Sequence, residues 1–144
     1  MNVKQGVSGG DNNTLGLSVV NSFLSDIDVD QNGDDNIALV TMNGTNQSDI
    51  VISQLSQGIG HTATIDLNNT NFVGASITQT GYNNAATITA ENATSSNATI
   101  IQGNFDNKAE IAFVDQDDNL DVLIDQSNSI GSDVTLNIGN NFTE

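Results

Sequence analysis

The residue types that usually carry catalysis are scarce in this chain of 144 residues. Cysteine is absent, His61 is the single histidine, and lysine and arginine together number 2. Without cysteine there is no disulfide framework and no thiolate site for a metal or for redox chemistry. One histidine gives neither a multi-histidine metal site nor a Ser-His-Asp triad with a credible arrangement. The sequence therefore predicts a protein that is not an enzyme and that needs no cofactor and no resident metal.

Acidic side chains are the abundant titratable groups, because 18 Asp and Glu give a formal charge of −16. The run Asp115-Gln116-Asp117-Asp118 offers the oxygen ligands that Ca²⁺ prefers. It lacks the EF-hand spacing, and Gly9-Gly10-Asp11 is only an isolated fragment of a calcium-binding glycine-aspartate repeat. A solvated acidic loop is the favoured interpretation, although calcium could still screen the charge. The negative charge also predicts that the chain binds neither nucleic acid nor anionic membrane surfaces.

Glutamine has the most regular spacing of the hydrogen-bonding residues. In an alternating apolar context it recurs at intervals of 26, 23, 25, 23 and 24 residues. The six positions are Gln5, Gln31, Gln54, Gln79, Gln102 and Gln126. A carboxamide both donates and accepts, so amides at equivalent places in stacked strands can form a hydrogen-bonded ladder. The spacing indicates an internal repeat of about 23 residues with short insertions.

Each repeat contains two alternating apolar runs about a short polar turn, which predicts strand, turn, strand. Three copies align without a gap: Ser25 to Met42, Val73 to Ala90 and Ser96 to Phe113. The other three copies need insertions in the turn, and the outer ones are the least regular, as terminal repeats usually are. We therefore expect a single domain, residues 1–144, with rungs at approximately 1–22, 23–46, 47–71, 72–94, 95–118 and 119–144.

One such unit cannot bury its apolar face alone, but units stacked at the strand spacing of about 4.8 Å bury a continuous seam. The predicted fold is all-β: a β-solenoid of cross-β type with about six strand-turn-strand repeats and two parallel sheets that stack head to tail into a fibre. The predicted core consists of Ile27, Val29, Ala38, Val40, Ile50, Ile52, Ala63, Ile65, Ile77, Ala86, Ile88, Ile100, Ala109, Ile111, Val122, Ile124, Val134 and Leu136.

Polar side chains at the strand-turn junctions are expected to form two ladders. The glutamines end the first strand of each rung, and a second column begins the second strand: Asn13, Asn36, His61, Asn84, Asn107 and Ser132. Ladder hydrogen bonds would spare these buried groups a desolvation cost of roughly 1–3 kcal/mol each. Gly33, Gly81, Asn104 and Asn128 lie where a tight turn would require a positive φ, which glycine and asparagine tolerate.

These residues resemble the curlin repeat, the Ser-x5-Gln-x-Gly-x4-Asn-x5-Gln pattern of the curli amyloid subunits of bacterial biofilms. The resemblance covers roughly residues 3 to 138, including Ser25, Ser48 and Ser96. The second glutamine of the pattern is replaced here by Met42, Leu67, Ala90, Phe113 and Ile138. The resemblance implies an extracellular functional amyloid that supports biofilm matrix and adhesion, leaves the cell unfolded through an outer-membrane secretion pore, and is started at the cell surface by a nucleating subunit.

The start of the sequence leaves two interpretations open, a cytoplasmic protein or the mature form of a secreted one, and the second is favoured. Proline is absent, which leaves every backbone N–H able to join a ladder. No stretch approaches the roughly 20 apolar residues of a membrane-spanning helix, and the first residues lack a signal-peptide core. We expect a mature secreted chain with an added Met1, a cell-surface fibre without membrane insertion.

The predicted register also places the charges. Asp26 and Asp49 would stack directly and repel by about 0.9 kcal/mol in water, whereas the other acids are scattered. Lys108 would face Asp133 of the next rung within the chain. Lys4 and Asp125 each precede a ladder glutamine, so they would meet between subunits that stack end to end.

The alternative from another functional class is a monomeric β-solenoid, either an adhesin segment or an ice-binding module with a flat threonine face. Thr62, Thr64, Thr87, Thr89 and Thr135 are expected to point outward, but they do not form regular paired columns across the rungs. Monomeric solenoids also need caps at their ends, and the repeat pattern here begins and stops close to both ends of the sequence.

Overall fold

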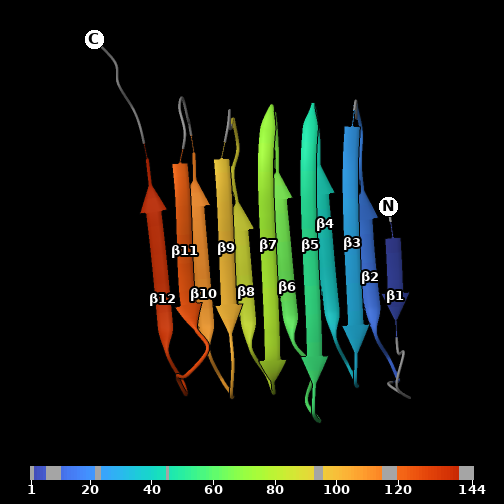
Figure 1. Cartoon of the computed structure of the whole chain (residues 1–144), viewed down its shortest axis with the longest axis vertical. Coiled ribbons are helices and arrows are strands. Elements are labelled where there is room, and N and C mark those ends of the chain that lie inside the picture. The colour runs from blue at the N-terminus through green and yellow to red at the C-terminus, as the bar shows by residue number, and fades with distance from the viewer. Residues whose placement is uncertain are drawn as a thin grey trace.

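The fold is an all-β solenoid, and the computed structural model describes residues 2–5, 11–21, 24–44, 46–92, 96–114 and 120–139 of it. Side-by-side strands form two sheets of six strands each, and all neighbours within a sheet pair in parallel. The strands stand in one row, with the N-terminal strand at one end of the row and the C-terminal strand at the other (Figure 1). The predicted all-β solenoid with two parallel sheets is confirmed, and the stacking of subunits into a fibre stays a prediction. Among the described residues, no helix is long and apolar enough to cross a membrane.

The chain alternates between the two sheets at every turn. The first sheet contains β1 (Asn2–Gln5), β3 (Leu24–Asn32), β5 (Gln47–Ser56), β7 (Phe72–Gly81), β9 (Ser96–Gln102) and β11 (Leu120–Gln126). The second sheet contains β2 (Thr14–Ser18), β4 (Ile37–Met42), β6 (Thr62–Leu67), β8 (Ala85–Thr89), β10 (Lys108–Phe113) and β12 (Asp133–Ile138). One strand of the first sheet and the following strand of the second sheet together form a rung.

The register of the sheets follows the glutamine spacing. Gln31 pairs with Gln54, Gln54 with Gln79, Gln79 with Gln102, and Gln102 with Gln126. Inserted residues do not disturb this register, because the turns absorb them. For example, Gln54 and His61 are separated by two more residues than Gln31 and Asn36, yet Ala38 and Ala63 still pair.

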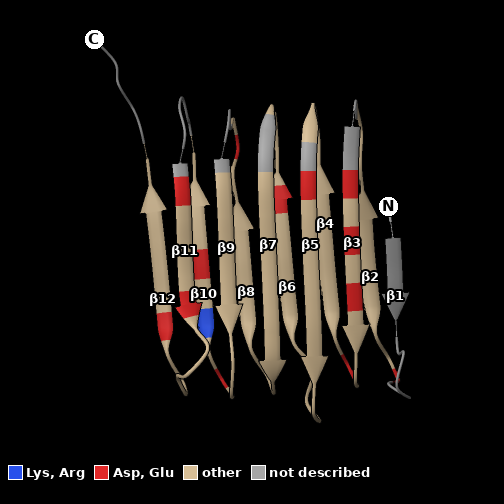
Figure 2. Ribbon diagram, viewed as in Figure 1, with Lys and Arg blue, Asp and Glu red and all other residues tan. Residues whose placement is uncertain are grey.

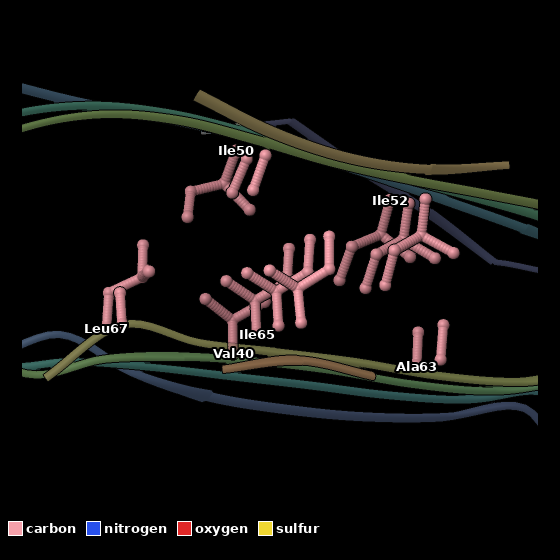
Figure 3. Close-up of a cluster of buried hydrophobic side chains, with 14 of the residues drawn as sticks. Val40, Ile50, Ile52, Ala63, Ile65 and Leu67 are labelled. Carbon is pink, nitrogen blue, oxygen red and sulfur yellow. The ribbon is translucent and has the colours of Figure 1, made fainter. Parts of the chain in front are cut away.

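The core is a narrow apolar seam between the two sheets. In Figure 3, Ile50 and Ile52 point from the first sheet toward Val40 and Ile65 of the second, and these four side chains are fully buried. Most of the predicted core residues are buried, and the seam extends further to Met42, Leu67, Ala75, Ala90, Ala98 and Phe113. Val134 and Leu136 are only partly buried, because β12 has a neighbouring strand on one side only.

The turn between the two strands of a rung contains two kinds of positive-φ position. Gly33, Gly81 and Asn104 have φ values of 92°, 98° and 58°, as the turn pattern predicts. The prediction for Asn128 is wrong, since its φ is not positive; the last turn closes locally, and Ser129 N–H donates to Gln126 O at 3.2 Å. A second positive-φ column directly precedes the asparagine column and was not predicted: Asn12, Asp35, Asn83, Asp106 and Gly131.

Charge is concentrated toward the two ends of the solenoid. Between residues 50 and 105 the sequence contains two acids, Asp66 and Glu91, and neither lysine. Figure 2 shows acidic positions on β3 near one end of the row and on β10 to β12 near the other, whereas β7, β8 and β9 are free of them. Asp26 and Asp49 pair directly in the register. The central rungs therefore stack with little electrostatic repulsion.

Candidate functional site: internal ladders and open strand edges

The glutamine column is a continuous hydrogen-bonded ladder. Each Nε2 donates to the Oε1 of the next rung, from Gln31 to Gln54 at 3.0 Å, then to Gln79 at 3.0 Å, Gln102 at 2.9 Å and Gln126 at 2.8 Å. These five side chains are at most 3% exposed. In these four bonds the donor always belongs to the more N-terminal rung, so the glutamine-to-glutamine ladder has one polarity. Gln5 lies in β1, but its side chain is outside the described part of the structure.

The same amides also join the two sheets. Gln31 Nε2 donates to Thr14 O at 3.1 Å, and Gln54 Nε2 donates to Ile37 O at 3.0 Å. In both cases the carbonyl belongs to the second sheet of the preceding rung. The pattern repeats for Gln79, Gln102 and Gln126. Gln31, Gln54, Gln79 and Gln102 thus each join three rungs and both sheets, and Gln126 joins two rungs. An apolar side chain of the same size would leave those backbone carbonyls without this donor.

The asparagine column forms a ladder of another kind than the sequence predicts. The side-chain oxygen accepts from the backbone N–H of the next rung, for example Asn36 Oδ1 from His61 N–H at 3.1 Å and Asn84 Oδ1 from Asn107 N–H at 3.0 Å. The expected donation from amide to amide is therefore wrong for this column. The amide nitrogens instead close their own turns, as Asn84 Nδ2 does by donating to Thr80 O at 2.9 Å.

Both ends of the asparagine column follow the same rule. Asn13 Oδ1 accepts from Asn36 N–H at 2.9 Å at the N-terminal end. Asn107 Oδ1 accepts from Ser132 N–H at 3.0 Å at the C-terminal end. Where a further rung follows, the position requires a side-chain acceptor of suitable reach, which explains why a histidine can replace asparagine. Ser132 ends the column and takes part through its backbone N–H.

His61 fills the third position of the column with a ring nitrogen. Its Nδ1 accepts from Asn84 N–H at 3.2 Å, and its Nε2 lies 3.1 Å from Leu55 O. The first contact requires an unprotonated Nδ1, so the neutral ring carries its hydrogen on Nε2 and donates to Leu55 O. Burial lowers the pKa of His61 below 6.5, which the hydrogen bond to Leu55 opposes only in part. The folded chain therefore contains His61 with a neutral ring.

The outermost strands present open edges. Among the described residues, β1 and β2 have strand neighbours only toward the C-terminus, and β11 and β12 only toward the N-terminus. Parallel strands present alternate residues to opposite neighbours. Because Lys108 N–H donates to Ser132 O at 2.7 Å, the N–H groups of Asp133, Thr135 and Asn137 point to the open side. The two ends are complementary, since every rung has the same register.

The two lysines occupy the register positions expected of them. Lys108 pairs with Asp133 within the second sheet. Lys4 pairs with Asp30, and the same register column ends at Asp125. The Lys4 side chain is outside the described part of the structure, so only the backbone position is known. A contact between Lys4 and Asp125 of two subunits stays a prediction.

Two surface features were missed by the sequence analysis. At the turns that connect one rung to the next, exposed asparagines pair. For example, Asn43 Nδ2 donates to Asn68 Oδ1 at 2.9 Å. At the turn between the two strands of a rung, the rings of Tyr82 and Phe105 lie in a tilted contact with centroids 6.2 Å apart. Both features could have been found, because the paired residues lie one repeat apart in the sequence. They indicate that the stacking continues from the core to the surface.

The threonine face is irregular. Thr64 pairs with Thr87, but Thr62 pairs with Ala85 and Thr87 with Glu110. The threonines therefore do not form the repeated two-column array on which the ice-binding alternative depends.

Within the described residues, no group of three or more His, Asp and Glu could hold a metal ion. The acidic run from Asp115 to Asp118 lies outside that part of the chain. In comparisons with known proteins, no family model, curated protein or solved structure matched this chain.

Proposed function

We propose that this chain is the structural subunit of an extracellular functional amyloid fibre of the curli type, which supports biofilm matrix and adhesion. The observation that carries the proposal is the pair of open edges at the two ends of a solenoid with one register throughout. A strand edge with unpaired N–H and C=O groups is a template for another strand. A second copy that stacks end to end would continue both sheets.

The internal ladders support the same mode of addition. At the C-terminal end, Gln126 Nε2 donates to Lys108 O and Ser132 O, both at 3.0 Å. Gln102 donates to the equivalent Ala85 O and also to the next glutamine. The contact that Gln126 lacks is the one that Gln5 of a second copy would supply. Heterologous contacts of this kind do not close and generate a filament.

The dimensions follow from the fold. Six rungs at the parallel-strand spacing of about 4.8 Å give a rise of about 29 Å per subunit, with strands perpendicular to the fibre axis. Secretion through an outer-membrane pore, a nucleating subunit and the cell-surface location belong to this proposal through the resemblance to the curlin repeat.

Incubation of the purified chain, followed by electron microscopy and fibre diffraction, tests the proposal. We expect fibres with a meridional reflection at about 4.7–4.8 Å. Thr135→Pro removes an N–H that faces the open edge of β12, so it should block growth while the monomer keeps its β-rich circular dichroism spectrum. Thr135→Ala, the matched control, should still form fibres.

A wild-type protein that stays monomeric and β-rich would contradict the proposal and favour the adhesin or ice-binding module. Fibre growth by Thr135→Pro at the rate of Thr135→Ala would show that the fibre does not extend through the edge of β12.

A further inference from the structure

The backbone register defines which residues meet when one copy stacks on another. One outward column of the first sheet contains Lys4, Asp30, Ser53, Thr78, Ile101 and Asp125. A second copy that continues the sheet beyond β11 places its Lys4 directly after Asp125. Lys4 then lies between Asp125 of the neighbouring copy and Asp30 of its own chain.

Asp125 already has a partner at this edge. Its Oδ1 accepts from Ser127 N–H at 2.9 Å. In the preceding rung the equivalent N–H, that of Gly103, donates to Gln126 O of the next rung at 3.3 Å. The carboxylate therefore occupies the donor that would otherwise bind the carbonyl of an added rung. The Ser127 hydroxyl and N–H also lower the pKa of Asp125, so the group stays ionised.

The turn that follows Asp125 borders a cavity. An open cavity of about 370 Å³ is lined by Asp125, Gln126, Ser127, Asn128 and Ser129. In the interior rungs the equivalent turn residues are covered by the turn of the next rung. For example, Tyr82 N–H donates to Asn104 O at 3.0 Å. The cavity therefore lies on the face against which an added copy would stack.

We infer that Asp125 is a docking gate for a second copy of this chain, one that exchanges its hydrogen bond to Ser127 N–H for a contact with Lys4 of the incoming copy. This inference rests on the proposed function and specifies its register and polarity. The exchange frees Ser127 N–H to donate to Gln5 O of the incoming strand. Two copies that met through their C-terminal ends would instead oppose Asp121, Asp125 and Asp133 with the same acids.

A charge-exchange series measured by seeded fibre elongation tests this gate. Lys4→Glu and Asp125→Lys should each slow elongation, by roughly three- to tenfold at low salt, because like charges then meet at the junction. The double variant Lys4→Glu with Asp125→Lys should elongate faster than Lys4→Glu alone, because the two exchanged charges again attract at the junction, while the repulsion between the new carboxylate and Asp30 of the same chain remains. Added salt should reduce the differences, because it screens exposed charges.

Asp121→Lys is the matched control, because Asp121 lies on the same edge strand but its register column has no residue in β1. Combined with Lys4→Glu, it should leave elongation slow. Equal rescue by Asp121→Lys and Asp125→Lys would overturn the inference, since net charge would then explain the effect. Unchanged rates in both single variants would also overturn it while the fibre itself stands. A wild-type chain without fibres would instead remove the proposed function, and this inference with it.

Discussion

The inward-facing polar side chains join successive rungs through hydrogen bonds that run in both directions along the solenoid. Each glutamine donates to the glutamine of the next rung toward the C-terminal end, whereas the backbone donors of the asparagine column point toward the N-terminal end. Each interior rung therefore donates hydrogen bonds to the rungs on both sides and accepts hydrogen bonds from both. In a seam of low dielectric constant such hydrogen bonds are strong, and a buried polar group without a partner would be costly.

His61 makes this network sensitive to pH. The folded chain holds the neutral ring, and burial lowers its pKa below the value of 6.5 that an unfolded chain has. The unfolded state therefore binds the extra proton first as the pH falls. Stability is complete above pH 6.5 and decreases below it, down to the lowered folded pKa, with a slope of at most about 1.4 kcal/mol per pH unit.

Urea unfolding of dilute wild type and His61→Asn between pH 7.5 and 5 measures this effect. Asparagine supplies an uncharged acceptor for Asn84 N–H, as it does elsewhere in the column, so the variant should lack this loss. All groups other than residue 61 are the same in both proteins, so their contributions cancel in the difference. Parallel pH profiles for the two proteins would contradict the assignment.

At the scale of elements, the turns decide how closely rungs approach. Gly81 has a φ of 98°, and a Cβ there would overlap the backbone carbonyl of Asn104 in the next rung. Gly131 also has a positive φ, 61°, but a Cβ there would meet nothing within 4 Å. Substitutions at these two glycines therefore distinguish the cost of backbone strain, which both positions have, from the cost of a clash between rungs, which only Gly81 has.

We expect Gly81→Ala to destabilise the fold by about 3 kcal/mol or more, because backbone strain and a backbone overlap combine. Gly131→Ala should cost only about 1 kcal/mol, the strain of a left-handed alanine. Chemical unfolding of both variants checks the difference. Equal losses would mean that the turns of successive rungs do not touch as described.

The strands and their register could be predicted because alternation fixes which side chains face inward and the glutamines mark one position per rung. The second positive-φ column could not, since Asn12, Asp35 and Gly131 share a tolerance for that conformation and no common identity. The backbone contacts of the asparagine column were also out of reach. A pattern gives the position of a side chain, whereas its partner depends on the distance between rungs.

At the scale of the whole molecule, the solenoid is a sum of nearly equivalent interfaces between neighbouring rungs. Ser76 pairs with Thr99, and Ile77 with Ile100. Removal of residues 77–99 therefore joins Ser76 to Ile100 in register and places Gln102 against Gln54. Every remaining rung keeps its ladder contacts, so nothing in the structure requires all six.

The chain without residues 77–99 should fold as a five-rung solenoid with cooperative unfolding, and its fibres should keep the meridional reflection near 4.8 Å. Removal of residues 77–98 is the matched control. Thr99 then follows Ser76, and the shift of one residue turns Ile100 and Gln102 outward and puts Ile101 into the ladder. This control should lose the cooperative transition in thermal unfolding followed by circular dichroism. If both deletions behaved alike, the strand register would not be what determines stability.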